Sequence, residues 1–167
     1  MKKVTFILAV LAYFLLGTES FAQQSIWPGS QCVQWTAGDV VPTLNGSAIY
    51  NSSASASMRV DCPIERNDFS GFLHTPGIDS AWVSVIDMNY SADARCGLGS
   101  LSVSSTGVWT YVTSGSAFSA GASSGSQTLN LGALTFPNDR VHSFIGCIIP
   151  PSYAGNVSYL VNYYVNQ

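Results

Sequence analysis

The chain has 167 residues, of which 47% are hydrophobic, 12% aromatic and only 9% charged, and its net charge is −3. The apolar fraction is too high for a disordered chain, and the absence of heptads and of a Gly-X-Y period excludes fibrous classes. Six basic residues are too few to hold nucleic acid by neutralising its phosphates, so we expect no nucleic-acid partner.

The first 22 residues have the pattern of a secretory signal peptide. Two lysines precede an uncharged, apolar run from Val4 to Leu16, and the small residues Ser20 and Ala22 match the site that a signal peptidase cleaves. The alternative is a transmembrane anchor, which needs about 20 apolar residues and is less favoured for this shorter run. We expect cleavage after Ala22, so that residues 1–22 are a signal peptide.

Cleavage changes the composition of the chain. It leaves 145 residues that contain four arginines, no lysine and eight acidic residues. A domain of this size buries roughly 70% of the surface of its unfolded chain, which is enough for a hydrophobic core. No linker or repeat interrupts the sequence, so we expect one domain over residues 23–167. We expect it to be secreted, periplasmic or at the cell surface, with no transmembrane segment after cleavage.

Hydrophobic residues recur with a period of two along the rest of the chain, which is typical of half-buried strands in antiparallel sheets. Turn-forming pairs such as Asn45-Gly46, Thr106-Gly107 and Pro150-Pro151 separate the runs. No helical stripe with caps is present. We expect about eight strands, in chain order at residues 48–51, 57–62, 81–90, 100–104, 108–113, 128–132, 141–149 and 157–166.

This pattern predicts an all-β fold, an antiparallel two-sheet β-sandwich of the jelly-roll type, with a closed β-barrel as the alternative. The stretch from Ser114 to Ser126 is rich in Gly, Ser and Ala, and is either a flexible loop or a weak edge strand anchored by Phe118. In the last strand we expect one face to consist of Val157, Tyr159, Val161, Tyr163 and Val165.

Four cysteines remain after cleavage, at positions 32, 62, 96 and 147. An even number in an exported chain predicts two disulfides, for which three connectivities are open. We favour Cys32–Cys62, which joins the N-terminal segment to an early strand, and Cys96–Cys147, which joins the middle of the chain to a late strand. The alternative is a zinc site, but there is no Cys-x-x-Cys pair and no histidine at ligand spacing. We therefore expect no metal at these thiols and no cofactor.

Patterns for catalysis are weak. The string Gly121-Ala122-Ser123-Ser124-Gly125 matches a nucleophile elbow, but no helix follows it, as the elbow requires. His74, five residues before Asp79, and His142 are the available bases for a hydrolase. Glu65 is the one glutamate after cleavage, and isolated aspartates in turns do not make the carboxylate pair of a glycosidase. We expect no catalytic residue.

Acids and amides in loops raise the hypothesis of a calcium site. The candidates are Asp87-Met88-Asn89 with Asp93, and the turn at Asn138-Asp139, because calcium prefers carboxylate and carbonyl oxygens. No EF-hand loop is present. We prefer the alternative, that these acids form turns, and expect no metal.

Four Asn-x-Ser sequons begin at Asn45, Asn51, Asn89 and Asn156. They matter in a eukaryotic secretory pathway. The Met-Lys-Lys start and the short apolar run are more typical of bacteria. A chain this rich in serine and asparagine contains such triplets by chance.

The tryptophans and tyrosines raise the hypothesis of carbohydrate binding. Exposed rings of these residues form flat apolar platforms, beside which polar side chains bind hydroxyl groups. Most aromatic residues are expected in the core because they bury large areas. We expect Trp82 to be buried, and Trp27 and Trp35 to pack over the first disulfide.

Trp109 and Tyr111 are the predicted ligand platform. They lie on one side of the strand expected at 108–113, opposite Val108 and Val112. If the valines point into the core, the two aromatic rings point outward.

Two segments resemble a group of small secreted bacterial proteins of unknown function. In Val60-Asp61-Cys62-Pro63-Ile64 a Cys-Pro pair ends an early strand. In Cys147-Ile148-Ile149-Pro150-Pro151 a late Cys strand runs into proline, and a Tyr-rich strand from Ser158 to Val165 follows. The resemblance implies a disulfide-tied β-domain and no catalytic residue.

We therefore expect a secreted, non-catalytic domain that interacts with an unknown extracellular or cell-envelope partner, either a glycan or a protein. The alternative is a carbohydrate-binding module that uses exposed aromatic residues. A hydrolase is the third hypothesis.

Overall fold

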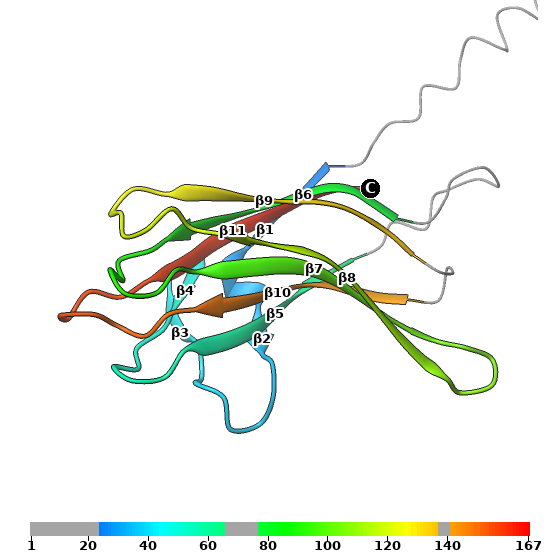
Figure 1. The fold of residues 1–167 in the computed structure, drawn as a ribbon, viewed down its shortest axis with the longest axis horizontal. Coiled ribbons are helices and arrows are strands. Elements are labelled where there is room, and N and C mark those ends of the chain that lie inside the picture. The colour runs from blue at the N-terminus through cyan, green and yellow to red at the C-terminus, as the bar shows by residue number, and fades with distance from the viewer. Residues whose placement is uncertain (1–23, 66–76, 137–140) are drawn as a thin grey trace, which may run out of the picture.

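The computed structural model describes residues 24–65, 77–136 and 141–167, which form a sandwich of two antiparallel β-sheets (Figure 1). The six-stranded sheet has the order β3-β4-β11-β6-β9, with β1 also paired to β11, and the five-stranded sheet has the order β2-β5-β10-β7-β8. The elements are β1 (Gln24–Pro28), the 3-10 helix η1 (Gly29–Gln31), β2 (Val33–Gln34), β3 (Thr43–Asn45), β4 (Ala48–Tyr50), β5 (Met58–Ile64), β6 (Gly77–Ile86), β7 (Arg95–Val103), β8 (Trp109–Phe118), β9 (Gln127–Thr135), β10 (Val141–Ile149) and β11 (Tyr159–Asn166).

The predicted all-β sandwich is confirmed, and the barrel alternative is wrong for the described residues, because they form two separate sheets. Strands β4 to β11 correspond to the eight predicted runs. β1, β2 and β3 are additional, and with 5, 2 and 3 residues they are too short for alternation to be visible. No helix in the described ranges is long and apolar enough to cross a bilayer.

The segment after Ser114 is an edge strand in its first part. β8 continues to Phe118 and pairs with β7 at the edge of the five-stranded sheet. Phe118 is 56% exposed and does not anchor the strand, whereas its neighbour Ala117 packs against the core. The physical reason is alternation: Ala117 faces the other sheet, so Phe118 faces outward.

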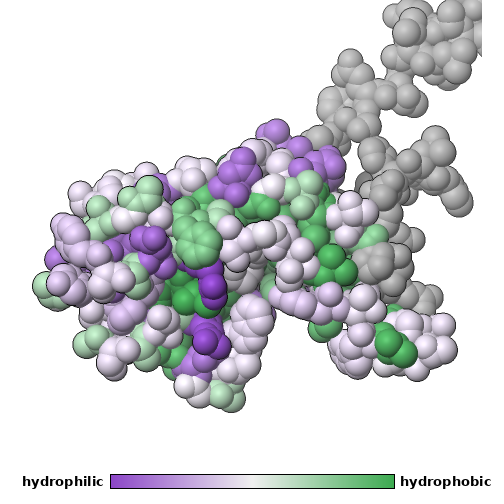
Figure 2. Space-filling model, in the orientation of Figure 1, coloured by the Kyte–Doolittle hydropathy of each residue, from purple (hydrophilic) through white to green (hydrophobic). Residues whose placement is uncertain are grey.

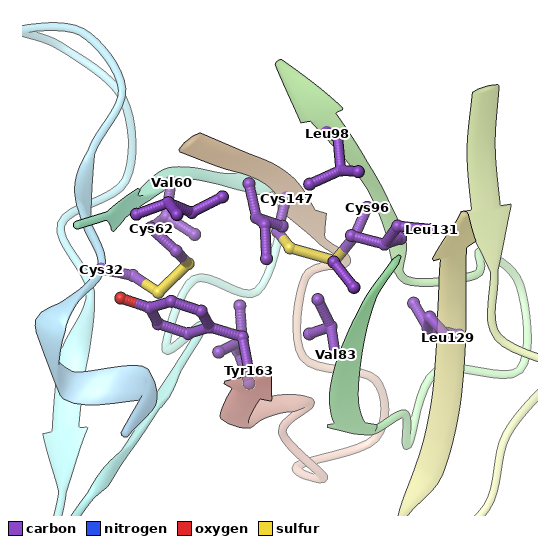
Figure 3. Packing of buried hydrophobic residues seen from close by; sticks show 14 of the residues in the cluster. Cys32, Val60, Cys62, Val83, Cys96, Leu98, Leu129, Leu131, Cys147 and Tyr163 are labelled. Carbon is purple, nitrogen blue, oxygen red and sulfur yellow. A yellow bond between two sulfur atoms is a disulfide. The ribbon is translucent and has the colours of Figure 1, made fainter. Parts of the chain in front are cut away.

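The hydrophobic core lies between the sheets and contains both disulfides (Figure 3). Alternate residues of β5, β6 and β10, among them Met58, Val83 and Ile145, are fully buried. The bonds join Cys32 to Cys62 and Cys96 to Cys147, the connectivity that we favoured from the sequence, and no cysteine is free.

Tyr163 of β11 is a fully buried polar residue at one end of this core. Its hydroxyl donates a hydrogen bond to the carbonyl of Pro63 at 2.8 Å, and its ring stacks on Trp27 with 5.4 Å between centroids. Burial, with a smaller contribution from the Glu65 carboxylate, raises the pKa of Tyr163 to about 12. The hydroxyl therefore stays protonated and ties β11 to β5 across the sandwich.

The predicted face of the last strand is wrong in its first half. Leu160, Tyr163 and Val165 point into the core, whereas Tyr159 lies outside. The register to β6 shifts between Leu160 and Asn162, so one additional residue stands in β11. Such a β-bulge reverses the face on which all later residues lie, and period-two reasoning does not include it.

Trp82 lies on the outer face of the six-stranded sheet, not in the core as expected. Its neighbours Ala81 and Val83 are fully buried, so alternation directs Trp82 outward. Its ring packs against Tyr164 with 4.8 Å between centroids, which leaves it partly covered.

The hairpin between β7 and β8 extends beyond the sandwich, at the lower right of Figure 1, and stands out as a lobe in Figure 2. Its turn is closed by a hydrogen bond from the Ser104 nitrogen to the Val108 oxygen at 2.8 Å. Gly107 has a φ of 80°, a left-handed conformation that favours glycine. The last pair of the ladder, Val103 and Trp109, therefore lies at the base of a projecting turn.

Candidate functional site

The outer face of the five-stranded sheet is the candidate site, and alternation along β10 shows how it forms. Ser143, Ile145 and Cys147 point into the core, so His142, Phe144, Gly146 and Ile148 point outward. Pairing places Phe144 beside Gly99 of β7 on one side and Pro63 of β5 on the other. Residues from distant parts of the chain thus meet around Phe144.

Three rings surround Phe144, and we call these four residues the aromatic cluster. Tyr111 of β8 stacks on Phe144 with 6.1 Å between centroids and an interplanar angle of 21°. His142 stacks at 5.8 Å, and Trp35 meets the same ring edge-on at 5.9 Å. Phe144 itself is only 6% exposed, whereas Trp35 is 43% and Tyr111 54% exposed. His142 is exposed as well, so the cluster presents three accessible rings on a buried support.

Glycines allow the rings to lie against the backbone of the sheet. A Cβ atom at Gly99 would stand 2.5 Å from Cζ of Phe144, and one at Gly146 would stand 2.8 Å from Cζ3 of Trp35. Both distances are shorter than van der Waals contact. Glycine inside a strand is unfavourable on its own, so its presence at both positions fits close approach of another group.

A carboxylate lies next to the aromatic cluster. Asp61 of β5 pairs with Gly146, so its side chain is on the outer face. Its buried Oδ1 has no hydrogen-bond partner among the described residues. Burial raises the pKa of Asp61 to about 6, against a smaller lowering by His142, and burial together with the Asp61 charge raises the pKa of Tyr111. A polar ligand group here would supply a partner that the protein lacks.

We expect Asp61→Asn to stabilise the protein at neutral pH by about 1 kcal/mol, because the side chain is only partly buried and solvent screens the full cost of its pKa shift. The pKa is raised from 3.8 to about 6, so the folded state binds the proton more tightly than the unfolded chain. The stability gained by protonating Asp61 is complete below the pKa of the unfolded chain. It is lost as pH rises through the higher pKa of the folded protein. Asparagine does not ionise and avoids this loss.

Urea unfolding of the wild type and of Asp61→Asn across this pH range measures the effect. Near the lower pKa the two proteins should be equally stable, because the wild-type carboxyl group is then neutral. Equal stability of the two proteins well above the higher pKa would show that burial of Asp61 carries no cost.

The structure exposes both residues of the predicted platform. Trp109 is 66% exposed and Tyr111 54% exposed, and they share the outer side of β8. Val112 packs against the core as expected, but Val108 is 60% exposed because it lies in the turn before the strand. Tyr111 belongs to the aromatic cluster, whereas Trp109 stands on the projecting hairpin.

Trp35 and Phe144 were missed as site residues. Trp35 was expected over the first disulfide, but its backbone nitrogen bonds to the Arg59 oxygen and continues the β2–β5 pairing, so its ring reaches the outer face. Phe144 lies in the run expected as a strand at 141–149, and it was not singled out from the sequence. The signal that identifies both is the pair of strand-interior glycines, Gly99 and Gly146.

The residues considered for catalysis are not assembled in the part that the structure describes. Ser123 accepts a hydrogen bond from the Gly125 nitrogen at 3.1 Å, in a loop between β8 and β9 rather than before a helix. His142 stacks on Phe144 in the aromatic cluster. His74 lies outside the described residues.

Asp87, considered above for calcium, has a structural role in the described part of the chain. Its fully buried carboxylate accepts hydrogen bonds from the backbone nitrogens of Asn89 and Ala94 and from the hydroxyls of Ser119 and Ser158. These bonds tie the β6–β7 loop to the ends of β8 and β11. Among the described residues no three acids, histidines or cysteines gather as a metal site, and Asn138-Asp139 lies outside them.

Two of the sequon asparagines are also structural. Asn51 is fully buried and donates to the carbonyls of Ile149 and Pro150, and Asn89 is 2% exposed and donates to Pro151. Both amides hold the loop before β11 in place. Glycosylation at either position is incompatible with this structure.

No family model matches the chain, and no curated protein matches it significantly. Among solved structures it is similar to a family two carbohydrate esterase from Cellvibrio japonicus, with a TM-score of 0.45 and 9% identity over 88% of this chain and 34% of that chain. It thus spans about a third of the esterase.

Two binding modules are also among the similar solved structures. The low affinity xylan binding module CBM86 from Roseburia intestinalis has a TM-score of 0.42 and 9% identity, over 87% of this chain and 96% of that chain. The module CBM36, solved in complex with calcium and xylotriose, has a TM-score of 0.41 and 12% identity, over 86% of this chain and 99% of that chain.

Proposed function

We propose that this protein is exported and binds carbohydrate, without catalysis, on the outer face of its five-stranded sheet. The observation that carries the proposal is the aromatic cluster, in which the accessible rings of Trp35 and Tyr111 flank the buried ring of Phe144. Sugars have apolar C–H faces that pack on such rings, and the rings are already fixed by packing, so little entropy is lost on binding.

Polar groups around the cluster match the hydroxyl groups of a sugar. The Asp61 carboxylate has an unpartnered oxygen, and His142 is exposed beside it. A carboxylate accepts hydrogen bonds from hydroxyls, and an imidazole donates or accepts them. Two disulfides fit an oxidising compartment, which supports export together with the predicted signal peptide.

The test is binding of the exported protein to a glycan array, followed by calorimetry on each glycan that binds. Trp35→Ala and Tyr111→Ala should each weaken binding by about tenfold or more, the usual cost of removing a central aromatic contact. Tyr90→Ala is the matched control, because Tyr90 is 75% exposed in the β6–β7 loop, outside the cluster. Trp109→Ala separately tests the residue predicted on the hairpin.

Unchanged affinity in both cluster variants would contradict the proposal. If no glycan binds at all, the proposal of carbohydrate binding is wrong. We would then infer that the same face binds a protein partner. Circular dichroism of each variant shows that the fold is retained, which is expected because Trp35 and Tyr111 are both partly exposed.

A further inference from the structure

Within residues 24–65, 77–136 and 141–167 the chain has two lysine or arginine residues, and both lie on the outer face of the five-stranded sheet. Arg59 of β5 and Arg95 of β7 are exposed, and both pair with Ile148 of β10, one from each side. Their neighbours in each strand, such as Val60 and Cys96, are buried, so the two guanidinium groups point outward.

The row that contains the arginines has an aromatic residue at each end. The Trp35 nitrogen donates to the Arg59 oxygen at 3.1 Å, and Phe118 pairs with Arg95. The order of residues across the sheet in this row is therefore Trp35, Arg59, Ile148, Arg95 and Phe118. Because neighbouring strands are about 4.8 Å apart, the two arginine Cα atoms are about 10 Å apart.

This arrangement repeats one chemical unit twice. Each unit is an aromatic residue with an exposed ring, 43% for Trp35 and 56% for Phe118, and an exposed arginine next to it in the row. A ring packs on the apolar face of a sugar, and a guanidinium binds a planar anion through two parallel N–H donors. The Trp35 ring lies over Gly146 in the next row, where Gly146 pairs with Gly97, so this ring joins the arginine row to the aromatic cluster.

We propose that the glycan bound by this face is acidic, with monoanionic carboxylate or sulfate groups, and that Arg59 and Arg95 bind these groups where the row of arginines adjoins the aromatic cluster at Trp35. This inference rests on the proposed carbohydrate binding. Asp61 lies in the next row, and its charge repels a doubly charged phosphate more than it repels a single charge, which favours a monoanion.

The experiment compares each acidic glycan that binds with a neutral form of the same polymer. Carboxyl reduction converts a uronic acid to the neutral sugar, and desulfation removes a sulfate ester, so the two arms distinguish the two sources of charge. We expect the neutral form to bind the wild type about tenfold more weakly or worse, and salt to weaken binding of the acidic form only.

Arg59→Gln combined with Arg95→Gln should remove this preference, while binding of the neutral form stays as in the wild type. Glutamine keeps hydrogen-bonding capacity without charge. Asp79→Asn changes the charge of the other sheet, because Asp79 is exposed on β6, and it should leave the preference unchanged if only charges on the proposed face are recognised. Arg→Lys at both positions keeps the charge but removes the planar fork, and should retain part of the preference.

Equal binding of acidic and neutral forms by the wild type would overturn this inference and leave carbohydrate binding intact. A preference for acidic glycans that persists in the double glutamine variant would also overturn it, since the charge would then be recognised elsewhere. Binding weakened by about tenfold or more in Trp35→Ala, together with removal of the preference for the acidic form in the double glutamine variant, is the joint result that both proposals require.

Discussion

Replacing Cys96 and Cys147 together by alanine is expected to lower the free energy of unfolding by about 4 kcal/mol, the loop-entropy value for a crosslink of this separation. The bond closes a loop over 51 residues and joins directly paired positions of β7 and β10. Both cysteines are 1% exposed in the core, so alanine also removes packed sulfur atoms. Because domains are stable by only about 5–15 kcal/mol, this change removes a large share of the total.

The measurement is denaturant unfolding of the oxidised proteins, with Cys32→Ala and Cys62→Ala as the matched pair. That bond spans 30 residues and should contribute slightly less, by roughly 0.5 kcal/mol in the same model. A loss well below that of the shorter loop would contradict the entropic account. We also expect the rings of the aromatic cluster to lose their arrangement, because β7 and β10 supply Gly99 and Phe144.

Gly99→Ala is expected to remove ligand binding and to destabilise the fold by about 1–3 kcal/mol, the usual cost of overpacking. The new Cβ would stand 2.5 and 2.6 Å from two atoms of the Phe144 ring. That ring has little room to move, because Trp35, Tyr111 and His142 surround it. The whole aromatic cluster must therefore shift, and the accessible rings lose their relative positions.

Gly115→Ala on β8 is the control, since a Cβ there meets nothing within 4 Å. A second test combines Gly99→Ala with Phe144→Ala. If the clash is the cause, the double variant should be more stable than the sum of the two single changes predicts, because removal of the ring removes the clash. Strict additivity would show that Gly99 serves another purpose.

Much of the local structure follows from the sequence because a strand needs only alternation. The eight runs from β4 to β11, the outward direction of Tyr111 and Asp61, and the exposure of Trp109 are all readable in this way. The failures are also local. The β11 bulge places Tyr159 and Tyr163 on opposite faces, and the alternation of β10 was not used to direct Phe144 outward.

The candidate site was only partly predictable, because its members come from four separate segments. Tyr111 was identified from β8, whereas Trp35 follows β2, Asp61 is in β5 and Phe144 is in β10. These segments are adjacent only in the order β2-β5-β10-β7-β8, which is not the order of the chain. Nothing in the local pattern specifies which strand pairs with which.

The sequence by itself therefore determined the class of fold, the expected number of disulfides and which side chains of most strands point out. Those properties depend on period-two alternation and on an even number of cysteines, which can be read from local patterns and from composition. Only the tertiary structure decided that Arg59 and Arg95 flank Ile148 and that Trp35, Tyr111 and His142 meet at Phe144. The reason is register: it is set by long-range pairing between strands, and a shift of one residue would place every one of these side chains on the opposite face.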